Sequence, residues 1–148
     1  MCGGLARWLR VLGVDASYTP GIDDGELVQH ALDDGRTVIS CDRKLFERRL
    51  FARGQLGGLR MPVGLRLREQ LRFVASRLDL PMGFPRCAAC NGELAPVQRS
   101  DVADVVPARS LVWAREFFRC RRCQHVFWEG THWRRIRAVR ADLERDDA

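Results

Sequence analysis

Long apolar runs, lysine and internal repeats are absent or scarce in this chain of 148 residues. No apolar stretch approaches the roughly 20 residues that cross a bilayer, which excludes a membrane-spanning helix and predicts no membrane partner. Arg7 interrupts the first residues too early for a signal peptide, so we expect a cytoplasmic protein. The length and ordinary composition predict one globular domain or two small ones.

Basic charge is carried almost entirely by arginine, since Lys44 is the one lysine among 25 basic residues, which stand against 19 acidic ones. Residues 115–140 concentrate the excess, with eight arginines against two glutamates. Arginine binds phosphate bidentately, and aromatic side chains in this stretch can stack on bases. A solvated basic face around an aromatic core is the alternative, and for the aromatic residues we favour it. The candidate RNA-binding residues are Arg119, Arg121, Arg122, Arg134 and Arg135.

Four cysteines form two Cys-x-x-Cys pairs, Cys87 with Cys90 and Cys120 with Cys123. Each pair brings two thiolates within reach of one ion, and four thiolates suit tetrahedral Zn²⁺. Such a set fills the coordination shell, which predicts a structural zinc with no open position for substrate. Two disulfides are the alternative, but a reducing cytosol favours the metal.

Apolar periodicity predicts alternating helices and strands in the first half of the chain. Alternation of this kind favours an α/β fold with a parallel sheet covered by helices. We expect helices near residues 5–12, 24–34, 43–52 and 67–78, and strands near residues 14–18, 37–41 and 59–65.

A proline- and glycine-rich break at residues 81–85 predicts a boundary between a domain of residues 1–84 and a zinc-ribbon domain of residues 85–148. Short strands are expected between the two cysteine pairs, and a final helix near residues 132–144. Asn91 and Gly92 after the first pair tolerate positive φ, whereas Gln124 after the second pair is less suited to it.

Acidic side chains stand at two positions where ligands bind in α/β proteins. Asp42 directly follows the expected strand of residues 37–41, while Asp23, Asp24 and Glu26 begin the helix beside it. Carboxylates that converge there can hold Mg²⁺ or Mn²⁺ through oxygen ligands. Alternatively, these aspartates only cap the helices that follow them, which the pattern alone favours.

Five features follow one another along the chain: the opening segment Gly3-Gly4-Leu5-Ala6-Arg7-Trp8-Leu9-Arg10-Val11-Leu12-Gly13, the acidic segments 22–27 and 40–45, the paired cysteines and the closing segment 127–133. In this order they resemble the Mut-seven C-terminal RNase family, a branch of the PIN-fold nucleases. The resemblance implies a PIN-like parallel sheet followed by a zinc ribbon, with metal-dependent cleavage of RNA. By position, Asp24 and Asp42 match the family's acidic motifs, which implies that they are catalytic. Asp23 and Glu26 are neighbouring candidates.

Some family features have no counterpart here. The family's first strand ends in a catalytic aspartate just before the opening helix, and Met1 stands where that strand should have ended. Gly4 and Cys41 occupy positions where arginine is common, and the acidic turn before residue 67 is shortened. We therefore expect a fold that lacks its first strand, impaired catalysis, and codons for the strand upstream of Met1.

Two functions of different class remain from the sequence. One is a Mg²⁺- or Mn²⁺-dependent ribonuclease without a small-molecule cofactor; the other is a non-catalytic RNA-binding or protein-adaptor module. A DNA-binding zinc ribbon would leave residues 1–80 unexplained. The sequence leaves the RNA target and the oligomeric state open.

Overall fold

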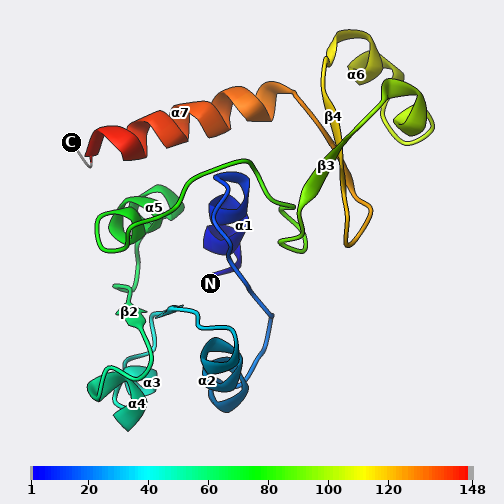
Figure 1. The fold of residues 1–148 in the computed structure, drawn as a ribbon. Coiled ribbons are helices and arrows are strands. Elements are labelled where there is room, and N and C mark those ends of the chain that lie inside the picture. The colour runs from blue at the N-terminus through cyan, green and yellow to red at the C-terminus, as the bar shows by residue number, and fades with distance from the viewer. Residues whose placement is uncertain (1, 147–148) are drawn as a thin grey trace. The chain divides into compact units, whose positions relative to one another are not determined.

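The computed structural model describes residues 2–146, which form two compact units (Figure 1). Within that range, unit 1 comprises residues 2–5 and 18–79, and unit 2 comprises residues 6–17 and 80–146. Residues 6–17 thus group with the C-terminal part, whereas the sequence placed them in a domain of residues 1–84. Helix α1 (Gly3–Val11) contributes residues to both units. No helix among the described residues is long and apolar enough to cross a membrane.

Unit 1 contains a pair of parallel strands, β1 (Val38–Ser40) and β2 (Gly58–Arg60), with Ile39 opposite Leu59. Helix α2 (Asp24–Asp33) precedes β1 and packs Val28 and Ala31 into the same core as Val38. The α/β class and the parallel pairing are as expected. The expected second strand is shorter than residues 59–65, because the chain leaves the ladder before Pro62, which has no N–H to donate.

The segment between the strands forms two short helices, α3 (Arg43–Phe46) and α4 (Arg49–Ala52), where one helix was predicted. The break lets the rings of Phe46 and Phe51 lie 5.0 Å apart between centroids. Both rings press on Gly58, where an added Cβ would lie 2.7 Å from each. Helix α5 (Leu67–Ala75) follows β2 and buries Leu71 and Val74.

Unit 2 contains an antiparallel sheet in the order β3 (Leu94–Val97), β4 (Phe117–Cys120) and β5 (Val126–Trp128). The long β3–β4 connection holds a 3₁₀ helix, η1 (Arg99–Val102), and helix α6 (Ala108–Trp113). Together they enclose a core of Val102, Val106, Ala114 and Phe117.

The aromatic residues of this unit mainly fill its core, as the sequence favoured. On β4, Phe117 and Phe118 are both buried. The Phe118 ring contacts the rings of Phe84 and Trp133 at centroid distances of 5.3 and 6.3 Å. Phe84 and Trp113 are exceptions, and each remains about half exposed. The final helix, α7 (Thr131–Asp146), confirms the prediction near residues 132–144.

The predicted strand at residues 14–18 is wrong. At its centre the Ala16 backbone bonds to side chains and not to a neighbouring strand: the Ala16 carbonyl accepts from Arg10 Nε at 2.7 Å, and the Ala16 N–H donates to Asn91 Oδ1 at 3.1 Å. A backbone N–H and C=O that are satisfied in this way leave no free pair for a sheet ladder.

Candidate functional sites

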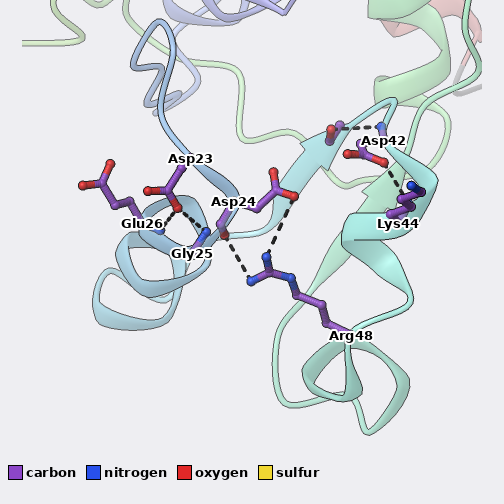
Figure 2. Close-up of polar contacts among 8 residues, drawn as sticks. Asp23, Asp24, Gly25, Glu26, Asp42, Lys44 and Arg48 are labelled. Carbon is purple, nitrogen blue, oxygen red and sulfur yellow. Dashed lines mark hydrogen bonds and ion pairs between the residues drawn. The ribbon is translucent and has the colours of Figure 1, made fainter.

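Asp23 acts as the N-cap of α2 (Figure 2). Its Oδ1 accepts from the backbone N–H groups of Gly25 at 2.6 Å and Glu26 at 3.0 Å. These bonds satisfy two of the donors that every helix leaves free at its N-terminus. Asp23 therefore has a structural role, while the Glu26 side chain is exposed to solvent.

Asp24, the first residue of α2, lies against Arg48 at the start of α4 (Figure 2). Arg48 Nη2 is 3.9 Å from Asp24 Oδ2, and Arg48 Nη1 donates to the Asp24 backbone carbonyl at 3.5 Å. Both side chains are about two-fifths exposed, so water screens the pair. Sequence reasoning did not single out Arg48, because 24 residues separate it from Asp24.

Asp42 lies just after β1 and is the N-cap of α3. Its Oδ1 accepts from the Lys44 N–H at 2.8 Å, and its own N–H donates to Ser40 Oγ at 3.1 Å. The cap occupies one carboxylate oxygen, and the side chain is exposed. Asp42 thus caps a helix as the alternative interpretation expected, yet it retains an oxygen for a ligand.

The four acids do not form a closed metal cage. Among the described residues, the four-cysteine cluster is the one group of three or more His, Cys, Asp or Glu side chains positioned to share a metal ion. Arg48 nevertheless links the two acids indirectly. It contacts Asp24, and it lies in the same short segment of chain as Asp42. Two exposed carboxylates suit Mg²⁺, which keeps most of its waters and accepts few protein ligands.

The two Cys-x-x-Cys pairs converge in unit 2. The Sγ atoms of Cys87, Cys90, Cys120 and Cys123 all lie within 4.8 Å of one another. Cys87 Sγ is 3.5 Å from Cys123 Sγ, and Cys90 Sγ is 3.4 Å from Cys120 Sγ. A tetrahedral Zn²⁺ with Zn–S bonds of about 2.3 Å needs sulfurs about 3.8 Å apart, so the cluster has the size and chemistry for zinc. All four cysteines are free thiols, and none of these distances approaches the roughly 2.05 Å of a disulfide.

Both cysteine pairs use the same turn. The residue after the second cysteine of each pair has positive φ, +67° at Asn91 and +62° at Gln124. The N–H of Asn91 donates to the Cys87 carbonyl at 2.8 Å, and that of Gln124 donates to the Cys120 carbonyl at 3.1 Å. Gln124 therefore adopts the positive φ for which glutamine was expected to be less suited than asparagine.

The pKa values of the Cys87 and Cys120 thiols are not equal. Burial raises the pKa of Cys87 to about 12. Burial of Cys120 acts in the same direction, but hydrogen bonds from the backbone N–H groups of Cys123 and Arg122 outweigh it and lower its pKa to about 7. Because zinc binds thiolates, metal loading must displace a proton from Cys87, whereas Cys120 is ready to ionise near neutral pH.

The five predicted RNA-binding arginines are not equivalent. Arg119 donates to the Asp101 carbonyl at 2.7 Å, and Arg122 donates to the Cys90 carbonyl at 3.1 Å. The Arg135 guanidinium lies 5.6 Å from the centre of the Trp8 ring. Arg121 and Arg134 are exposed, and their guanidinium groups bond to no side chain within the described part of the chain. These two are the most available for an external ligand.

The fold and the cysteine cluster define a mixed α/β protein that carries a four-cysteine ribbon able to bind zinc. A model of the Mut7-C RNAse domain family matches residues 1–140. The chain belongs to this family, which confirms the resemblance seen in its motifs and indicates a nuclease-like function with RNA as the substrate class. No curated protein and no solved structure matches the chain.

Proposed function

We propose that this protein is a metal-dependent ribonuclease in which Asp24 and Asp42 hold Mg²⁺ or Mn²⁺. The family match carries the proposal, because it spans both acidic segments and the cysteine ribbon. The positions of the two acids support it: Asp24 begins α2, Asp42 lies just after β1, and both carboxylates are accessible. Asp23 is assigned to capping and Glu26 to solvent, which leaves two acids for the metal.

When bound, such an ion lowers the pKa of coordinated water and offsets charge on the scissile phosphate. The Asp24 carboxylate must leave Arg48 to take part, and the released guanidinium is then placed for a phosphate oxygen of the RNA. Asp42 can bind through the oxygen that does not cap α3. In unit 2, zinc on the four cysteines holds the ribbon and takes no part in the reaction.

A non-catalytic RNA-binding module is the second candidate. The observation that favours it is the engagement of Asp23 and Asp42 in caps and of Asp24 with Arg48. In that case the exposed arginines of unit 2 would bind RNA, and the acids would serve stability alone.

Cleavage of end-labelled RNA in Mg²⁺ or Mn²⁺ distinguishes the two candidates. We expect metal-dependent cleavage by the unchanged chain and its loss in Asp24→Asn and in Asp42→Asn. Asp79→Asn is the matched control, since Asp79 is an exposed acid of the same unit. Equal cleavage by all four proteins would refute the role of the acids, and binding of RNA without cleavage would support the second candidate.

A further inference from the structure

Two polar side chains are buried among those that the structure describes, and both lie beside the first cysteine turn in unit 2. Arg10 on α1 is 6% exposed, and Asn91, which directly follows Cys90, is 7% exposed. A buried charge is costly unless it is paired and hydrogen-bonded. The position of these two residues therefore needs a physical explanation.

Arg10 joins α1 to the loop between the first two metal ligands. Its Nη1 donates to the carbonyls of Ala88 and Ala89, each at 3.0 Å, and both residues lie between Cys87 and Cys90. The Arg10 backbone carbonyl accepts from the Arg86 N–H at 2.8 Å, one residue before Cys87. The first cysteine turn is thus attached to both the side chain and the backbone of Arg10.

Asn91 makes a second attachment from the other side. Its Nδ2 donates to Asp15 Oδ1 at 2.6 Å, and its Oδ1 accepts from the Ala16 N–H at 3.1 Å and from Arg86 Nε at 3.2 Å. The same residue has the positive φ that closes the cysteine turn. The segment after α1 is therefore held by the residue that shapes the metal-binding loop.

The charge of Arg10 is opposite to that of a zinc site with four thiolates. Four thiolates around Zn²⁺ carry a net charge of −2, and a cation fixed nearby in a weakly polar interior compensates it. Burial lowers the pKa of Arg10, while the Cys87 and Cys90 thiolates and Asp15 act in the opposite direction.

We propose that Arg10 is the charge-compensating positioning residue of the zinc site, and that zinc in turn fixes the C-terminal half of α1 through it. Coupling between two sites is reciprocal, so a residue that strengthens zinc binding is itself held more firmly when zinc is bound. The ribbon would then be more than an appended module, because its metal stabilises the helix that opens the chain. This inference does not depend on catalysis.

Zinc affinity, measured by competition with a chromophoric chelator, tests the proposal directly. Replacing an outer partner of a metal ligand typically weakens binding about 10- to 100-fold, and we expect that range for Arg10→Gln. Arg10→Lys, which keeps the charge but not the paired hydrogen bonds, should fall between Arg10→Gln and the unchanged chain. Arg7→Gln is the matched control, because Arg7 lies three residues earlier on α1 and is exposed. Equal affinities of the Arg10→Gln and Arg7→Gln proteins would overturn the proposal.

Hydrogen exchange of the unchanged chain keeps the proposal testable if Arg10→Gln fails to fold. Chelation of zinc should speed amide exchange at residues 8–16, while α2 in unit 1 keeps its protection. If residues 87–123 lose protection on chelation and residues 8–16 exchange as slowly as before, zinc does not act on α1 and the proposal is wrong.

Discussion

At the residue scale, the polar side chains of this protein are used in unequal ways. Asp23 and Asp42 cap helices, a role that their position before a helix already allows one to predict. Arg48 and Arg10 could not be assigned in this way, because Arg48 bonds to Asp24, 24 residues away, and Arg10 bonds to Ala88 and Ala89, 78 and 79 residues away. Arg10 did carry one signal: it stands four residues after the buried Ala6, which places a charge on an apolar helix face.

Replacement of Arg48 should strengthen divalent-metal binding. Arg48→Ala removes the cation that competes with Mn²⁺ for the Asp24 carboxylate, and exposed pairs of this kind contribute up to about 1 kcal/mol. We therefore expect Mn²⁺ to bind up to about fivefold more tightly, measured by titration calorimetry on zinc-loaded protein. Arg49→Ala is the control, as its exposed neighbour. Identical Mn²⁺ affinities of the two variants would mean that Arg48 does not compete with Mn²⁺ for Asp24.

At the element scale, the sequence predicts the order of helices and strands well and their limits less well. The helix near residues 24–34 follows from periodicity, the strand near residues 37–41 from a short apolar run bounded by polar residues, and the final helix from Thr131 as a capping residue. The predicted strand at residues 14–18 fails for a reason that periodicity cannot reveal, since the side chains of Arg10 and Asn91 bond the Ala16 backbone. The one predicted helix at residues 43–52 is divided into α3 and α4, and the rings of Phe46 and Phe51 on these two helices pack against Gly58.

The cysteine cluster was predictable from spacing alone, because Cys-x-x-Cys specifies its own local turn. The sequence could not rank the candidate RNA-binding arginines, since their clustering along the chain does not tell which guanidinium groups are engaged within the unit. The structure engages Arg119, Arg122 and Arg135 and leaves Arg121 and Arg134 exposed.

RNA binding should therefore depend more on Arg121 and Arg134 than on other exposed arginines of unit 2. Removing one arginine–phosphate interaction reduces the slope of log affinity against log salt by about 0.7 for a single strand. The double variant Arg121→Gln/Arg134→Gln should lower the slope by about 1.4, measured by fluorescence anisotropy across a salt series. Arg109→Gln serves as the control from α6. A double variant with the slope of the unchanged chain would exclude these two residues from the interface.

At the scale of the whole molecule, the proposed function assigns two metal chemistries to one chain. Unit 2 has four cysteines whose soft thiolates suit zinc, and we propose that the hard carboxylate oxygens of unit 1 bind Mg²⁺ or Mn²⁺. The cysteine cluster is complete within the described residues. In the proposed site, Asp24 and Asp42 would supply two protein ligands, and water and substrate would take the remaining positions. The account as a whole depends on whether these two acids bind the divalent ion.

Paramagnetic broadening by Mn²⁺ in NMR spectra of the zinc-loaded protein tests that claim most directly. Zinc loading keeps Mn²⁺ away from the cysteines, and broadening falls steeply with distance from the ion. We predict that substoichiometric Mn²⁺ removes the amide signals of residues 23–26 and 41–44 first, that excess Mg²⁺ restores them, and that Asp24→Asn/Asp42→Asn abolishes the effect. Signals of residues 23–26 and 41–44 that stay sharp, or that broaden equally in the double variant, would contradict the proposed metal site.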